Sequence, residues 1–135
     1  MSDAVWALQR ALYQTLSADA GIQALLGAPA RIYDDPPPDA AFPYLVIGAT
    51  QASDWKGVDG GLQHDFRLHV FSRYAGRREV KEISGAVYDV LHEAAFPVDG
   101  HRLVNIRFVF ADAFRRQDGE AYHGVIRFRA ATQPL

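Results

Sequence analysis

The run from Leu62 to Ser72 constrains the fold of this chain most, because apolar and polar residues alternate along it. Successive side chains of a β-strand point to opposite faces of the sheet. The alternation therefore predicts a strand with one buried face and one open face, as antiparallel sheets commonly have. The predicted buried side carries Phe66, Leu68 and Val70, and the predicted open side carries Asp65, Arg67 and His69.

Four further segments predict strands of the same sheet. Residues 44–49 are mostly apolar, and we expect them to be buried on both faces. Residues 31–33 predict a short strand that ends before the prolines at 36–38, which cannot donate ladder hydrogen bonds. Two strands are expected near the carboxyl end, at 102–110 with Val104, Ile106, Phe108 and Phe110 inward, and at 122–131 with Ile126 and Phe128 inward.

Two segments carry apolar residues at spacings of three and four, which predicts helices with one buried face. The first runs from Asp3 to about Leu16, with Ser2 or Asp3 as its cap, and the second runs from near Arg77 to about Ala95. A short helix is expected between them, at 22–26. The stripe on the second helix predicts a core in which Val80, Ile83, Val87 and Leu91 pack against Phe66, Leu68, Ile106 and Phe128.

These elements predict the α+β fold class, with an antiparallel β-sheet of about four to five strands and two helices packed on one face. The 135 residues match the usual size of one domain, so we expect a single domain over residues 1–135. The chain has no cysteine, which excludes disulfides and thiolate metal sites. Its net charge of −2 gives no general attraction for nucleic acid, and no apolar run approaches the ~18 residues that span a bilayer.

The sequence predicts no catalytic, metal or cofactor site. His64 and His69 are five residues apart on a strand, so they should point to opposite faces and cannot bind one ion together. Asp34 and Asp35 are adjacent on an extended segment, and a role in turn stabilisation is favoured over acid–base chemistry. The glycine-rich loop at 57–61 lacks the lysine and the helix of a phosphate loop. We therefore expect the chain not to be an enzyme.

The outward strand positions and two loops are the candidate interaction sites. The outward positions of the predicted strands carry several arginines, so one face of the sheet should be basic. Such a face could simply be solvated, or it could be a subunit interface, because arginine is enriched in protein interfaces. Nucleic-acid binding is a weaker alternative, because no aromatic platform is expected among these arginines. The tryptophan loop and a charged hairpin end at 114–120 add further exposed positions. The candidate interface residues are Trp55, Lys56, Arg67, His69, Arg107, Arg115, Arg116, Arg127 and Arg129.

The order of four motifs resembles the tail-completion, or tail-terminator, proteins of long-tailed phages and gene transfer agents. The chain carries a Tyr-Asp start at 33–34, a Phe-Pro-Tyr strand entry at 42–44, a tryptophan loop at 54–57 and a strand at 64–73 that ends in Val-Phe-Ser-Arg. The resemblance continues into the helix after Gly76 and the last strand, so it covers most of the chain.

The resemblance implies a structural virion protein that needs no cofactor. Such a protein forms a homo-oligomeric ring, with six copies expected, on the finished tail tube, ends tube polymerisation and joins the tail to the head. The implied partners are further copies of the chain, the tail tube protein and a head-side connector or stopper protein, with DNA passing through the ring without specific binding and with no membrane. The implied location is a virion or phage-like particle assembled in the bacterial cytoplasm. The alternatives are another particle component, such as a head–tail stopper or tube protein, and a small ligand-binding or enzymatic α+β domain.

Overall fold

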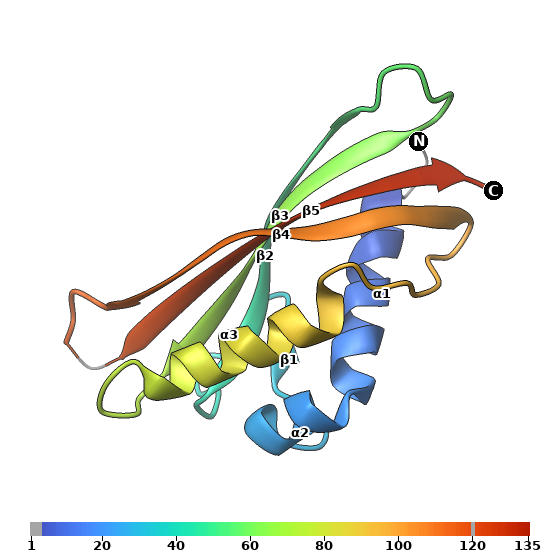
Figure 1. Ribbon diagram of the computed structural model, residues 1–135. Coiled ribbons are helices and arrows are strands. Elements are labelled where there is room, and N and C mark those ends of the chain that lie inside the picture. Colours follow the sequence, from blue (N-terminus) through green and yellow to red (C-terminus); the bar gives the residue numbers. More distant parts are fainter. Residues whose placement is uncertain (1–3, 120) are drawn as a thin grey trace.

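The computed structural model describes residues 4–119 and 121–135 and confirms the α+β fold class. Its elements are α1 (Ala4–Ala18), α2 (Ala20–Leu26), β1 (Ile32–Tyr33), β2 (Tyr44–Asp54), β3 (Leu62–Ser72), α3 (Arg78–Leu91), β4 (His101–Arg115) and β5 (Tyr122–Pro134). In the described residues the strands form one twisted sheet in the order β1-β2-β3-β5-β4 (Figure 1). The sheet is mixed, because β1 runs parallel to β2 while the other neighbours are antiparallel.

Helices α1 and α3 cover one face of this sheet, and no helix of the described residues lies over the other face (Figure 1). The predicted stripe of α3 is fully buried, and it lies in one core cluster with the inward residues of β3, β4 and β5, as expected. Gly124 on β5 allows the close approach of α3, because a Cβ atom at this position would clash with the side chain of Val80. The core members that the sequence predicted are Val80, Ile83, Val87, Leu91, Phe66, Leu68, Ile106 and Phe128.

Strand β4 corrects one prediction from the sequence. Ile106 and Phe108 face the core, but the register shifts between Leu103 and Asn105 and again between Phe108 and Phe110. A β-bulge adds one residue to a strand and so moves the following side chains to the other face. As a result Val104 is 37% exposed and Phe110, which was predicted to face inward, is 45% exposed on the uncovered face.

Strand β2 and the helix ends also differ from the prediction. Leu45 and Ile47 are buried, whereas Val46 between them is only half-buried, because β2 has helices on one side alone. Helix α3 ends at Leu91 instead of near residue 95, and His92 follows it in an extended conformation. The predicted caps Ser2 and Asp3 lie outside the described residues.

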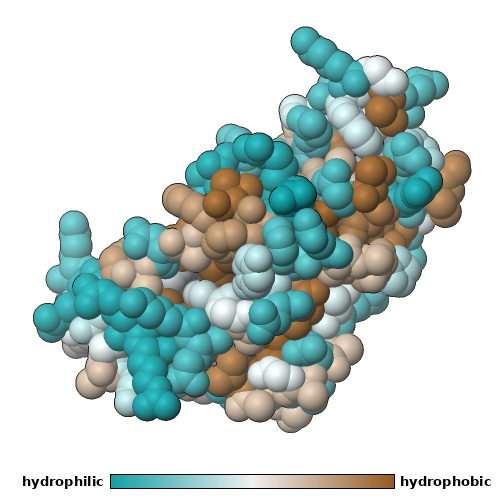
Figure 2. All heavy atoms as spheres, in the orientation of Figure 1, coloured by the Kyte–Doolittle hydropathy of each residue, from teal (hydrophilic) through white to brown (hydrophobic). Residues whose placement is uncertain are grey.

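The helix side of the surface is unevenly polar. Figure 2 shows hydrophilic residues gathered over the amino-terminal half of α3, at the lower left, while hydrophobic residues reach the surface at the right, where β4, β5 and α1 overlap in the view of Figure 1. None of the helices in the described part of the chain is long and apolar enough to cross a membrane.

Candidate interaction surface

The uncovered face of the sheet brings together most of the predicted interface residues. We call it the open face, and it is formed by the outward side chains of β2, β3, β5 and β4. The register places Arg67 opposite Arg127 and places Arg129 between Asp65 and Arg107. Directly opposite residues share a face, so these charged side chains form a continuous group across three strands. The predicted clustering of basic residues on one sheet face is therefore found.

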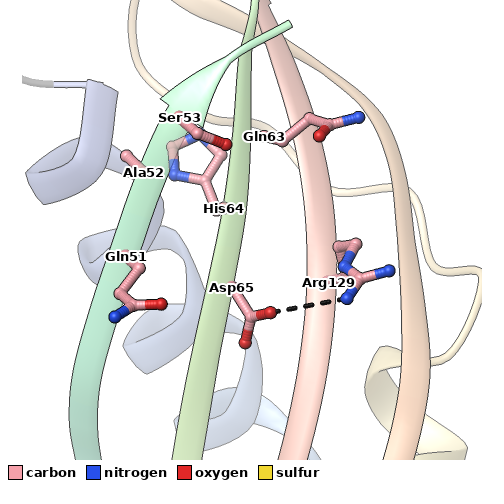
Figure 3. Close-up of a pocket in the computed structure, with 7 residues that line it drawn as sticks. All are labelled: Gln51, Ala52, Ser53, Gln63, His64, Asp65 and Arg129. Atoms are coloured by element: carbon pink, nitrogen blue, oxygen red, sulfur yellow. Dashed lines mark ion pairs between the residues drawn. The ribbon is translucent and has the colours of Figure 1, made fainter.

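Asp65 holds this group together. Arg127 donates from Nε to Asp65 Oδ1 over 2.7 Å and from Nη2 to the other carboxylate oxygen, while Arg129 Nη2 lies 3.6 Å from Oδ2. The hydrogen bonds from Arg127 lower the pKa of the Asp65 carboxyl, and the same pair raises the pKa of Arg127. Figure 3 shows Asp65 and Arg129 pointing toward each other in a depression that Gln51, Ser53 and Gln63 also line.

The arginines of the open face consequently differ in what they can offer to a partner. Arg127 is half-buried and engaged by a bidentate pair. Arg107 forms an exposed pair with Glu93 at 3.4 Å, which is worth little to the fold. Arg67 is exposed and forms no ion pair with any residue in the described ranges. Arg67, Arg107 and Arg129 can therefore turn to a partner more readily than Arg127.

The open face also carries a row of stacked rings, which corrects the expectation that it lacks an aromatic platform. The rings of Tyr44 and Phe71 stack at 5.1 Å, Phe71 and His123 stack at 4.5 Å, and Phe114 lies 4.9 Å from His123. The guanidinium of Arg116 lies 5.4 Å from the centre of the Phe71 ring. The row thus crosses four strands, from β2 to β4, beside the arginines.

Part of this row could have been found in the sequence. Phe71 has the same parity on β3 as Arg67 and His69, so alternation alone places it on the open face. The position of Phe114 could not be read in this way, because the bulge at Val109 changes the parity of β4.

His69 pairs with His123 inside the ring row. The distance from His69 Nδ1 to His123 Nε2 is 2.9 Å, and Gly48 leaves room for the His69 ring, since a Cβ atom there would lie 2.6 Å from it. Burial lowers the pKa of His69, and burial together with His69 and Arg116 lowers the pKa of His123 to about 4. Both rings are therefore neutral at pH 7, and one nitrogen of the pair donates while the other accepts.

The loops contribute to two separate ends of the sheet. Trp55 is half-buried and shares a depression of about 530 Å³ with Arg107 and Arg129, so the structure brings these three predicted residues together. Lys56 is exposed beside it. Arg115 and Arg116 lie at the β4–β5 hairpin, which is at the opposite end of the sheet from the tryptophan loop (Figure 1). Residue 120 of the predicted hairpin loop lies outside the described residues.

The remaining histidines have local structural partners. His64 is buried on the helix side, opposite to His69 as predicted, and its Nε2 lies 2.8 Å from Thr132 Oγ1. His92 Nδ1 accepts from the amide of Phe108. Within residues 4–119 and 121–135, no three histidine or acidic side chains gather in a way that could hold a metal ion. In the pair of aspartates at 34–35, Asp34 accepts a hydrogen bond from Gln9 on α1.

The open face thus carries paired charges, stacked rings and a tryptophan loop, which suit contact with another macromolecule. A family model described as "Tail completion protein gp17" matches residues 10–133. The chain belongs to this family. The resemblance read from the sequence is confirmed, and the chain is a structural component of a phage-type tail.

A solved structure shows a similar chain. A chain of the structure titled "Virion of native gene transfer agent (GTA) particle" is 33% identical in sequence to this chain, with a TM-score of 0.87. The match covers 98% of each chain, so it includes all five strands and all three helices of the described part. Among curated protein sequences, none matches.

Proposed function

We propose that the chain forms a ring on the end of a phage-like tail tube, where it ends tube polymerisation and joins the tail to the head. The observation that carries this proposal is the family match over residues 10–133, and the full-length similarity to a chain from a gene transfer agent virion supports it. A closed ring follows when each copy offers one patch to a different patch of its neighbour. Six copies are expected in the ring.

The proposed location is the virion, after assembly in the bacterial cytoplasm, and the proposed partners are the tail tube protein and a head-side connector or stopper protein. DNA passes through the ring without specific binding. The chain acts as one domain over residues 1–135, with no cofactor, membrane or enzymatic activity. In this proposal the chain acts only through its contacts with other particle components.

We assign the open face to these contacts with other particle components. Tyrosine, tryptophan, phenylalanine and arginine are enriched at protein interfaces. The ring row and the depression around Trp55 supply these residue types on one uncovered surface. The interface proposed for them comprises Trp55, Lys56, Arg67, His69, Arg107, Arg115, Arg116, Arg127 and Arg129.

Deletion of the gene in a producing strain tests the function. Tail lengths and head attachment are measured by negative-stain electron microscopy, with the wild-type gene on a plasmid as the control. The proposal predicts tails of irregular, increased length without heads, and rescue by the plasmid. Tails of normal length that lack heads would instead indicate a connector, and complete loss of tubes would indicate a tube protein. Either result would refute the terminator role.

A further inference from the structure

Two aromatic side chains of α1 remain exposed at the β1 side of the sheet. Trp6 is 52% exposed and Tyr13 is 44% exposed, although α1 buries the residues on its other side. Together with Ile32, Ile47 and Asp34 they line a groove of about 320 Å³. We call this the α1–β1 groove. Aromatic walls over an apolar base suit the binding of an apolar side chain.

The opposite edge of the sheet is also apolar. In the described residues β4 is the outermost strand and pairs with β5 alone. Long edge strands attract other chains unless they are protected. The segment after α3 covers part of the outer hydrogen-bonding edge of β4, because the amide of Glu93 donates to the carbonyl oxygen of Ile106 and the amide of Phe108 donates to His92 Nδ1. The exposed side chains are therefore what β4 can present to a partner. We call the exposed apolar residues of this strand the β4 edge: Val104, Val109, Phe110 and Phe114.

The two edges carry opposite charges. Residues 32–44, beside the groove, contain three aspartates and no lysine or arginine, a net charge of −3. Arg10 also lines the groove, and its charge is paired with Asp99. Strand β4 contains three arginines and one aspartate, a net charge of +2. Opposite charges at the two edges favour contact between unlike edges and disfavour contact between two β4 edges.

We propose that the β4 edge of one copy docks into the α1–β1 groove of the next copy, with Phe110 as the central apolar contact. The sheet order places the two surfaces at opposite edges, so each copy uses one of them with each neighbour. Such a head-to-tail contact closes into a ring when the rotation between copies allows it. It uses the β4 margin of the open face, where Phe110 and Phe114 lie, and leaves the rest of that face, with Arg67 and Arg129, free for other particle components. The proposal rests on the proposed function in that it assumes a ring.

Cysteine crosslinking tests this contact, because the natural chain contains no cysteine. The variants are Tyr13→Cys in the groove, Phe110→Cys on the β4 edge, and the double variant. A short bis-maleimide crosslinker is used, since its reach exceeds that of a disulfide. It is applied to the purified protein and to particle-producing cells. Denaturing gels then count the linked copies, and thermal melting verifies that each variant is folded.

The contact predicts a ladder of linked copies for the double variant that ends at one closed species. Each single variant alone should stay unlinked, and a mixture of the two should stop at dimers. As a matched control, Tyr74→Cys places the second cysteine at an aromatic residue of similar exposure, 44%, outside both surfaces, and Tyr13→Cys with Tyr74→Cys should give no ladder.

Dimers formed by either single variant alone would show a symmetric contact and overturn the proposal. So would a folded double variant that stays unlinked both in solution and in cells. The crosslinking result and the deletion result can fail independently of each other. A ladder combined with normal tail length in the deletion strain would support the contact and refute the terminator role.

Discussion

The two faces of the sheet contain similar residue types in very different surroundings. On β3, His64 and Phe66 face the helices and are at most 1% exposed, whereas His69 and Phe71 on the same strand face away and are half-buried. Helices α1 and α3 seal the first face, while on the open face side chains cover only one another, by ring stacking and by the Asp65–Arg127 pair. The difference teaches that burial here depends on what lies over a face more than on the residue itself.

This difference suggests a division of roles. The covered face supplies the apolar burial that keeps the chain folded. The open face keeps rings and arginines in fixed positions without a cover of its own, which suits contact with a partner. Substitutions on the covered face should therefore reduce stability, and substitutions on the open face should mainly reduce assembly. The following predictions test this separation, from the largest expected change in stability to the smallest.

Truncation of Ile83 to alanine should give the largest loss of folding stability. Ile83 is fully buried between α3 and the sheet, so Ile83→Ala should lower the free energy of unfolding by about 2–5 kcal/mol. The matched control is Val46→Ala on the open face, where a loss below about 1 kcal/mol is expected. Urea denaturation measures both. Equal losses would remove the proposed distinction between the faces.

Lowering the pH should reduce the free energy of unfolding, because a buried histidine that is neutral in the folded chain binds a proton more readily in the unfolded chain. Burial lowers the pKa of His64 to about 4, from 6.5 in an unfolded chain. Below pH 6.5 the unfolded chain therefore takes up a proton first, and stability falls until the pH reaches about 4. His64 alone accounts for at most about 3 kcal/mol of this loss. Denaturation at pH 7 and pH 4.5 should show a smaller difference for His64→Gln than for wild type, and an unchanged difference would contradict this assignment.

The ion pair between Asp65 and Arg127 should contribute less to the free energy of unfolding than a core side chain, but more than an exposed ion pair. Both side chains are partly buried, 29% exposed for Arg127 and 21% for Asp65, so Asp65→Ala should cost about 1–2 kcal/mol. The control Glu82→Gln breaks the exposed pair with Arg78, for which about 0.3–0.5 kcal/mol is expected. If Asp65→Ala melts like wild type, the charged group on the open face contributes nothing to folding.

Substitution of the less engaged arginines should leave stability almost unchanged and reduce particle yield. The double variant Arg67→Glu/Arg107→Glu avoids Arg127 and Arg129, which both pair with Asp65. Its melting temperature should stay close to that of wild type, because exposed charges contribute little to folding. Its ability to complement the gene deletion should fall, because like charges repel at a formerly complementary interface. Full complementation would show that the open face makes no essential contact through these residues.

The sequence predicted those parts of the fold that depend on periodicity. The stripe of α3 and the alternation of β3 each repeat without interruption, so Ile83 and Phe66 were placed correctly in the core. The bulges of β4 have no such signature, and the prediction for Phe110 was wrong for that reason. The parallel pairing of β1 was also missed, because two residues carry no direction signal.

The candidate site was predictable only as a list of outward residues. Alternation placed Arg67, His69, Arg127 and Arg129 on one face, as the structure shows. It could not show that Arg127 is held by Asp65, nor that His123 joins His69, since both depend on the register between β3 and β5. The proximity of Trp55 to Arg107 depends on how the β2–β3 loop folds over the sheet, which has no local sequence signal.

Electron cryomicroscopy of purified particles from a deletion strain complemented by a tagged copy of the gene tests the central claim most directly. A tag fused to the chain and labelled with gold reports where the protein lies and how many copies are present. The account predicts a single ring at the head-proximal end of the tail tube. Copies spread along the whole tube, or complete absence of the chain from tailed particles, would contradict it.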